Sequence, residues 1–382
     1  MAERVDFLII GAGIAGASIG YWLAAQGRVA LLERESQPGY HATGRSAALF
    51  MESYGTPQVC ALSKASKDFL LHPPAGFSEP ALVSPRGALI VAGPGQETLL
   101  AEHWESMRAI TPRAQLLDRS STCALVPVLR PDKVLGAIFD PDALDMDVDA
   151  LHQAYLRGAR RAGATLHCNA EVSVIERSGQ HWRVRAGAVE FEAGVLINAA
   201  GAWADEVARR AGAERLGLEP RRRSAFIFAP PEGLATAHWP MVFGIGDDWY
   251  FKPDAGMLLG SPSNADPVAP QDVQPEELDI ALGIYQIEEM TTLKIRRPTR
   301  TWAGLRSFVA DSDHVGGFDP KVPGFFWVAA QGGSGIMSSA AMGQACAALV
   351  RNLPLPAHIA ANGLSAEMLS PARLACAPKN QT

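Results

Sequence analysis

The stretch Val5-Asp6-Phe7-Leu8-Ile9-Ile10-Gly11-Ala12-Gly13-Ile14-Ala15-Gly16 decides the fold of this 382-residue chain. Its apolar first half predicts a buried parallel strand, and the three glycines predict a tight turn into a helix of small apolar residues. A second strand, 29–32, ends in the acid Glu33, twenty residues after Gly13. Strand, glycine turn, helix, strand and acid in this order are typical of a dinucleotide-binding unit.

Each glycine of the turn has a distinct task. Gly11 permits the tight turn, Gly13 lets the backbone approach a pyrophosphate, and Gly16 lets the helix pack closely on the sheet. The carboxylate of Glu33 can accept hydrogen bonds from ribose hydroxyls and disfavours a 2′-phosphate, which predicts FAD or NAD rather than NADP. The uncharged residues 7–27 could also be read as a signal peptide or a membrane span. Their glycines and the mixed charges before them favour a soluble protein that begins with its cofactor strand.

The composition narrows the class of protein. A net charge of −6 does not indicate a nucleic-acid partner, and the length suits two domains. The five cysteines are scattered without a CxxC pair, which argues against a disulfide framework or a metal site and suits a reducing compartment. We expect a cytoplasmic protein, with peripheral contact to the inner membrane as an alternative, no membrane span, and a monomer or small homo-oligomer.

A second strand–glycine–helix unit follows near the C-terminus. Residues 324–330 predict a strand, Gln331-Gly332-Gly333-Ser334-Gly335 a glycine loop, and 336–350 a helix of small residues. The positive end of that helix would point at a cofactor, and the pyrimidine edge of a flavin, which becomes anionic on reduction, is its natural target. An NAD enzyme does not need this unit, so the two units together favour FAD.

Two other segments are candidates for cofactor contacts. Residues 34–48 are rich in turn formers and end in small residues. We interpret them as a cofactor loop that ends in a helix start, where Ser46 and exposed amides could hold a phosphate or a polar ring edge; an ordinary loop is the alternative. Residues 194–205 predict a buried strand, a glycine turn and a helix, where a ligand could approach the backbone. His41 is more consistent with a polar loop residue than with a catalyst.

The middle of the chain differs in character. Residues from about 220 to 305 alternate like antiparallel strands, and 81–92 predict two strands around a Pro-Arg-Gly turn. The run Arg221-Arg222-Arg223 enters one of these strands. Strand alternation places Arg221 and Arg223 on one face and Arg222 on the other, so at least one arginine should face a cleft or core.

Together these motifs resemble the D-amino acid oxidase/glycine oxidase family of FAD-dependent amine oxidoreductases. The stretches that carry the resemblance are 11–16, Glu33, 43–46, 198–203 and 332–335. Within the family the chain is most similar to the bacterial D-arginine and D-amino acid dehydrogenase branch, through residues 37–41, 222–226, 252–256 and 302–306. The resemblance implies an α/β, α+β overall, fold: a glutathione-reductase-type Rossmann FAD-binding domain (1–82, 148–219 and 307–382) with an inserted antiparallel-sheet substrate domain (83–147 and 220–306).

The resemblance also implies a set of site residues. Arg223 and Arg306 would clamp the substrate carboxylate, Tyr54 and Tyr250 would lie near it, and the backbone of Gly333 would face the substrate amine. Either arginine could instead be a structural ion-pair partner. The positions implied to hold FAD are Gly11, Gly13, Ile14, Ala15, Gly16, Glu33, Arg34, Thr43, Gly44, Arg45, Ser46, Ala48, Val172, Ala200, Gly201, Trp203, Arg306, Gly332, Gly333, Ser334, Gly335, Ile336 and Met337.

The implied reaction is oxidative deamination of a D-amino acid. A hydride leaves the α-carbon for flavin N5, the imine hydrolyses to a 2-oxo acid and ammonia, and dioxygen or a quinone of the respiratory chain reoxidises the flavin. No protein nucleophile or metal is needed. Oxidation of secondary amines such as sarcosine or glycine, or of 2-hydroxy acids, is the alternative on the same scaffold.

The chain departs from the D-arginine branch where a cationic side chain would bind. The acid that follows the Ser-Pro-Arg turn in that branch is absent at Ala88, and a histidine is replaced by Leu49; Glu52 is a candidate replacement acid. The predicted pocket wall is mostly apolar or aromatic: Leu49, Met51, Tyr54, Met241, Phe243 and Tyr250. We therefore predict that uncharged D-amino acids are better substrates than D-Arg or D-Lys. Acidic ones should be poor unless one arginine turns to meet the side chain.

Overall fold

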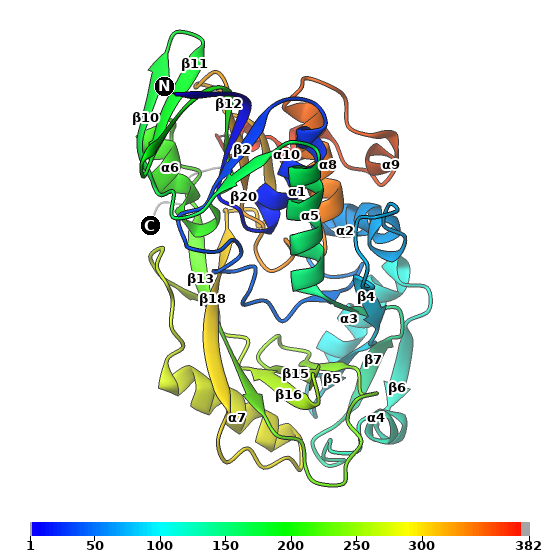
Figure 1. Cartoon of the computed structure of the whole chain (residues 1–382). Coiled ribbons are helices and arrows are strands. Elements are labelled where there is room, and N and C mark those ends of the chain that lie inside the picture. The colour runs from blue at the N-terminus through cyan, green and yellow to red at the C-terminus, as the bar shows by residue number, and fades with distance from the viewer. Residues whose placement is uncertain (1, 376–382) are drawn as a thin grey trace.

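A parallel sheet forms the upper half of the molecule in Figure 1, a computed structural model that describes residues 2–375. Its parallel strands lie in the order β9-β2-β1-β12-β20. Their bounds are β1 (Glu3–Ile10), β2 (Val29–Leu32), β9 (Thr165–His167), β12 (Val189–Asn198) and β20 (Phe325–Ala329). The predicted meander, β10 (Val172–Ser178), β11 (His181–Ala186) and the first half of β12, extends the sheet on one side, and β19 (Val315–Phe318) pairs with β20.

Small residues let the helices that cover this sheet pack closely against one another. The helices α1 (Ile14–Ala24), α2 (Pro57–Leu71), α5 (Val148–Arg161) and α8 (Ser339–Leu349) contribute to one core with residues of β1, β2, β12 and β20. A side chain at Gly343 of α8 would lie 2.8 Å from the side chain of Ser18 on α1. Glycine at this position therefore sets how closely the two helices approach.

The second large sheet forms the lower half in Figure 1. Its strands are β5 (Ala88–Ala92), β6 (Gln115–Asp118), β7 (Gly136–Asp140), β13 (Glu219–Phe228), β14 (Met241–Gly244), β15 (Tyr250–Asp254), β16 (Met257–Ser261), β17 (Asp266–Pro267) and β18 (Arg300–Phe308). All pairings are antiparallel except β5 with β14. The mixed α/β fold with an added antiparallel sheet is confirmed; the exact domain boundaries stay a prediction.

The remaining elements cover the sheets or connect them. Helix α7 (Glu277–Met290) packs on one face of the second sheet through Ile287. The other helices are α3 (Glu97–Ile110), α4 (Arg119–Leu125), η1 (Gly201–Trp203), α6 (Ala204–Arg210), α9 (Ala357–Ala360), α10 (Ala366–Leu369) and α11 (Ala372–Ala375). A small sheet joins β3 (Leu49–Phe50), β8 (Leu144–Met146) and β4 (Val83–Pro85). In the described part of the chain no helix has the length and apolar character that a membrane crossing requires.

The long strands β13 and β18 link the two halves. They pair antiparallel from Glu219 opposite Phe308 to Ile227 opposite Arg300, and Figure 1 shows them running from the parallel sheet down to α7. Because Arg306 is opposite Arg221, the register places Arg221, Arg223 and Arg306 on one face of this pair. Two of these arginines, Arg223 and Arg306, line the cavity described below.

Two local predictions were wrong. No helix starts at Ser46; residues 46–48 are irregular and lead into β3. Helix α8 begins at Ser339 rather than 336, after a series of turns. The two strands predicted around the Pro-Arg-Gly turn are present as β4 and β5, and β4 joins the small sheet while β5 joins the large one.

Candidate active site

One elongated cavity lies against the carboxyl ends of β1, β2, β12 and β20 and extends to β13, β15 and β18. Most positions predicted to bind a cofactor or substrate are on its wall: Gly11, Gly13, Ile14, Ala15, Glu33, Arg34, Thr43, Arg45, Ser46, Val172, Ala200, Gly201, Trp203, Arg223, Tyr250, Arg306, Gly332, Gly333, Gly335 and Ile336. The predicted positions that are not among its lining residues are Gly16, Gly44, Ala48, Tyr54, Ser334 and Met337.

The N-terminal glycine turn has no room for side chains. Gly11 has φ +99°, and a Cβ there would lie 2.4 Å from the carbonyl oxygen of Ala199. A Cβ on Gly16 would lie 1.9 Å from the carbonyl oxygen of Gly11. Gly16 therefore packs beneath the turn, as its predicted role requires, although it does not line the cavity.

Glu33 is fixed where β2 meets the cavity. One carboxylate oxygen accepts a hydrogen bond from the Ala12 amide at 3.1 Å and the other accepts from the Glu35 amide at 3.0 Å. Thr43 accepts from the Ile14 amide at 3.0 Å, which ties the loop after β2 to the start of α1. Each carboxylate oxygen of Glu33 keeps acceptor capacity, which two ribose hydroxyls could use.

His152, a residue that the sequence did not indicate, supports the same turn. It is buried on α5, and its Nε2 donates to the carbonyl of Ala12 at 2.8 Å. Burial lowers the pKa of His152, so the ring is neutral at neutral pH. Gly39 must lack a side chain here because a Cβ would lie 2.9 Å from the ring.

The end of the cavity near Val172 contains two arginines and two aromatic rings. The carbonyl of Val172, a position implied to hold FAD, already accepts from a guanidinium nitrogen of Arg210 on α6. The guanidinium of Arg34 lies 4.9 Å from the ring centre of Trp203, and the ring of His41 lies 4.7 Å from it. Sequence reasoning missed Arg210, which lies 38 positions from Val172.

The other end collects the predicted substrate-binding residues. Arg223, Tyr250 and Arg306 line the cavity from three strands of the second sheet. A Cβ on Gly333 would lie 3.0 Å from Nη1 of Arg306 and 3.1 Å from the hydroxyl of Tyr54. Tyr54 therefore belongs to this group although it stands at the edge of the cavity, and glycine at 333 lets the turn 331–335 reach both side chains.

The two arginines of this end have no acidic partner. Among residues 2–375, neither Arg223 nor Arg306 forms an ion pair, whereas Arg222, on the opposite face of β13, pairs with Asp266, Glu276 and Asp279. Burial and the neighbouring Arg306 lower the pKa of Arg223. Burial also acts to lower the pKa of Arg306, but Tyr54, Tyr250 and Asp247 outweigh it and hold that pKa above its usual value.

The turn 331–335 contains a buried amide nitrogen without a partner beside the cavity. Gln331 lines the cavity, and its buried side-chain nitrogen Nε2 has no hydrogen-bond partner. The backbone of Gly332 has φ +49°, and its amide donates to the carbonyl of Ser307 at 3.0 Å. A free amide donor at this end and a glycine turn beside Glu33 at the other fit a cofactor with a polar ring system and a dinucleotide body.

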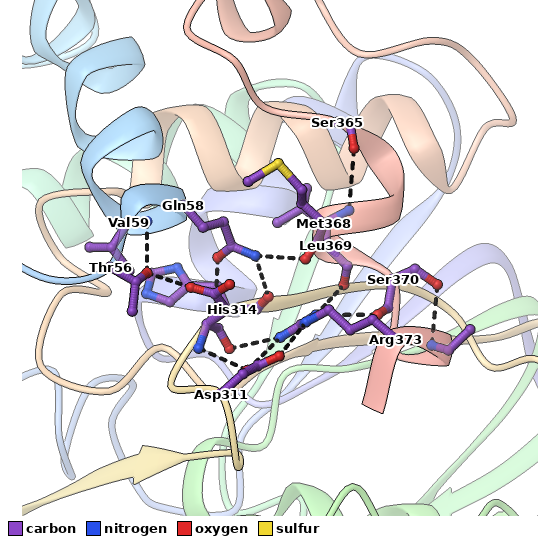
Figure 2. A network of polar contacts seen from close by, with 12 residues as sticks. Thr56, Gln58, Val59, Asp311, His314, Ser365, Met368, Leu369, Ser370 and Arg373 are labelled. Atoms are coloured by element: carbon purple, nitrogen blue, oxygen red, sulfur yellow. Dashed lines mark hydrogen bonds and ion pairs between the residues drawn. The ribbon is translucent and has the colours of Figure 1, made fainter. Parts of the chain in front are cut away.

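A polar network, shown in Figure 2, connects to this turn through His314. His314 places Nε2 2.9 Å from the hydroxyl of Ser334, and burial lowers its pKa to about 4, so it is neutral at neutral pH. Gln58 of α2 accepts from the His314 amide and donates to its carbonyl. Arg373 of α11 pairs with Asp311 at 2.8 Å. The network joins three distant segments behind the turn, and the sequence had no signal for it.

Only one of the six residues predicted to form the pocket wall is a lining residue of the cavity. Of the six residues, Tyr250 lines the cavity; Leu49, Met241 and Phe243 pack with Tyr250 in one apolar cluster, and Met51 is buried in another. Glu52 is not on the wall and pairs with Lys67 at 2.5 Å. No acid therefore replaces the one missing at Ala88 among the lining residues near the two arginines. In the part of the chain that the structure describes, no cluster of His, Cys, Asp or Glu could hold a metal ion.

Comparisons with known proteins show which family and which folds the chain is similar to. A family model described as FAD dependent oxidoreductase (DAO) matches residues 6–349. The FAD-dependent oxidoreductase domain-containing protein 1 of Bos taurus is 24% identical over 413 residues, covering 91% of this chain and 81% of that protein. L-2-hydroxyglutarate dehydrogenase of Escherichia coli is 31% identical over 257 residues, covering 62% of this chain and 56% of that protein. The structure of glycine oxidase from Geobacillus kaustophilus is similar, with a TM-score of 0.82, 23% identity, and coverage of 92% of this chain and 96% of that one.

Proposed function

The chain belongs to the DAO family of FAD-dependent oxidoreductases, and from that premise we propose that it oxidises a D-amino acid at the bond between the α-carbon and the nitrogen. The observation that carries the proposal is the pair Arg223 and Arg306, two guanidinium groups on the cavity wall without an acidic partner in residues 2–375. Burying a cation without a partner is costly. A substrate carboxylate is the group that would remove this cost.

The chain's own residues would bind and orient the substrate. The planar fork of Arg306 can donate two parallel hydrogen bonds to a carboxylate, which fixes the α-carbon in one orientation. The hydroxyl of Tyr54 lies beside the guanidinium of Arg306 near Gly333, and Tyr54 helps to hold the pKa of Arg306 above its usual value. Gly333 has no side chain, which leaves space for the substrate amine beside Arg306.

Other residues would hold the cofactor. Glu33 would bind the ribose, the turn from Gly11 to Ile14 the pyrophosphate, and Gln331 with the turn 331–335 the flavin end. Bound FAD supplies the acceptance of a hydride from the α-carbon. The released imine hydrolyses in water to a 2-oxo acid and ammonia, and dioxygen or a quinone would take up the electrons. We place this reaction in the cytoplasm.

Two other substrate classes are specific alternatives. Likeness to the glycine oxidase fold makes glycine and secondary amines such as sarcosine candidates. The sequence relation to L-2-hydroxyglutarate dehydrogenase makes 2-hydroxy acids candidates. All three classes carry the carboxylate that Arg306 would bind, so the substrates turned over and their products distinguish the classes together.

Steady-state assays with one dye acceptor test the proposal. A D-amino acid should give equal amounts of 2-oxo acid and ammonia, sarcosine would give an amine or an aldehyde instead, and a 2-hydroxy acid would give an oxo acid without ammonia. We expect D-Leu to be turned over and its kcat/KM to exceed that of D-Arg, because burying an unpaired guanidinium costs several kcal/mol. Turnover of hydroxy acids alone would overturn the proposal. A kcat/KM for D-Arg more than about tenfold above that for D-Leu, equivalent to about 1.4 kcal/mol, would overturn the side-chain preference.

A further inference from the structure

We propose that the preferred substrates carry two carboxylates: an acidic D-amino acid or an N-carboxymethyl amino acid, with Arg306 on the α-carboxylate and Arg223 on the second. This inference rests on the proposed oxidation of a carboxylate-bearing amine at this end of the cavity. This inference reverses the expectation from the sequence that acidic substrates are poor. That expectation had one condition, an arginine that could meet the side chain of the substrate, and we assign this role to Arg223.

The first argument is a comparison among the shielded arginines of the chain. Arg45, Arg86, Arg222 and Arg373 all have side chains no more than 16% exposed, and each pairs with at least one carboxylate. Arg223 and Arg306 line the cavity and have no such partner within residues 2–375. They therefore leave two positive charges at the cavity wall for a ligand to match.

The second argument is that the two guanidinium groups are anchored at separate points. Arg306 is opposite Arg221, whereas Arg223 is opposite Gly304, so the two positions differ by two residues along the strands. At about 3.4 Å per residue this offset is close to 7 Å. Nε of Arg223 donates to the carbonyl of Asn264 at 2.8 Å, while the guanidinium of Arg306 lies beside Tyr54 and Gly333. Separate anchors suit two carboxylates better than a single shared one.

The third argument concerns the acids in the neighbourhood. Asp247, whose charge reaches both guanidinium groups, is exposed on the turn between β14 and β15 and accepts from the hydroxyl of Ser263 at 3.3 Å. Solvent screens an exposed charge at that position. The acids that line the cavity, Glu33, Glu171 and Glu206, belong to the end near Val172. The end of the cavity near Arg223 and Arg306 therefore carries two positive charges, and a substrate with one carboxylate would neutralise only one of them.

The choice of Arg306 for the α-carboxylate follows from its neighbours. Arg306 lies beside the backbone of Gly333 in the turn 331–335, whereas Arg223 is fixed further along the wall by Asn264. The reacting carbon must lie next to the flavin end, so the arginine beside the turn 331–335 would hold the carboxylate attached to that carbon.

The test compares substrates that differ in one charge. Steady-state kcat/KM would be measured for D-Glu against D-Gln, D-Asp against D-Asn, and iminodiacetate against sarcosine. In at least one pair the diacid should exceed its monocarboxylate partner by about tenfold or more, equivalent to 1.4 kcal/mol. Equal or better turnover of the monocarboxylate in all three pairs would overturn the inference and leave the proposed oxidation intact. Absence of turnover with every carboxylate-bearing amine would instead overturn the proposed function.

A variant of Arg223 tests whether this arginine binds the second carboxylate of the substrate. Arg223→Gln should lower the ratio of diacid to monocarboxylate kcat/KM by about tenfold or more. The matched control is Arg221→Gln, which lies on the same strand and face but pairs with Glu219 at 2.6 Å; the ratio should not change. FAD content and thermal unfolding of both variants show whether they fold. An equal loss for both members of every pair in a folded Arg223→Gln protein would overturn the assignment.

Discussion

Replacing Arg306 by alanine is expected to lower kcat/KM about 30- to 1000-fold, with most of the change in KM. The guanidinium lines the cavity beside Gly333 and has no acidic partner among residues 2–375. Removing a charge-assisted contact to a bound carboxylate costs about 2–4 kcal/mol, and each 1.4 kcal/mol is about one factor of ten. Steady-state kinetics over a wide range of substrate concentration would measure the loss.

Arg300→Ala is the matched control for this variant. Arg300 lies on the same strand, β18, but it is exposed and does not line the cavity. Its kcat/KM should stay within about twofold of the original protein, since surface substitutions away from a site have small effects. An unchanged kcat/KM for Arg306→Ala would show that the guanidinium does not bind substrate.

Gly11→Ala is expected to lower the free energy of unfolding by about 2–5 kcal/mol and to yield protein with little FAD. The left-handed backbone at φ +99° costs an L-residue about 1–2 kcal/mol. The added methyl would lie 2.4 Å from the carbonyl oxygen of Ala199, and overpacking of this kind adds about 1–3 kcal/mol. Denaturant unfolding and the ratio of flavin absorption to protein absorption would measure the two effects.

Gly163→Ala separates backbone strain from the steric clash. Gly163 has φ +97°, nearly the angle of Gly11, but a Cβ there would meet no atom within 4 Å. This control should lose only about 1–2 kcal/mol of stability and keep its FAD. Equal losses in the two variants would mean that the turn at Gly11 has space for a methyl group, which contradicts its close packing on Ala199.

The parts of the site that the sequence predicted are those set by local geometry. The turn from Gly11 to Gly16 and the acid Glu33 follow from a strand–turn–helix–strand pattern within 33 residues. The alternation of a strand was enough to separate Arg222 from Arg223, and the structure places them on opposite faces of β13. Local periodicity decides such features before any tertiary contact forms.

The parts that the sequence did not predict depend on contacts between distant segments. Gln58 meets His314 across 256 positions, and His152 meets Ala12 across 140. Neither pair belongs to a motif. The start of α8 was predicted too early because its small residues suit a helix equally well at 336 and at 339, and only the turn around Gly332 decides between them. Leu49 and Phe243 were expected on the pocket wall, but their packing against each other depends on side-chain volumes in three dimensions.

Anaerobic mixing of the purified protein with substrate tests most directly whether a carboxylate-bearing amine reduces FAD in this cavity. The protein should be yellow, and at least one D-amino acid, acidic D-amino acids included, should bleach the visible flavin absorption without any added acceptor. Arg306→Ala protein should need a substrate concentration higher by a factor of about 30 or more for the same bleaching. A colourless protein that binds NADH, or a flavin that stays oxidised with every carboxylate-bearing amine, would contradict the central claim.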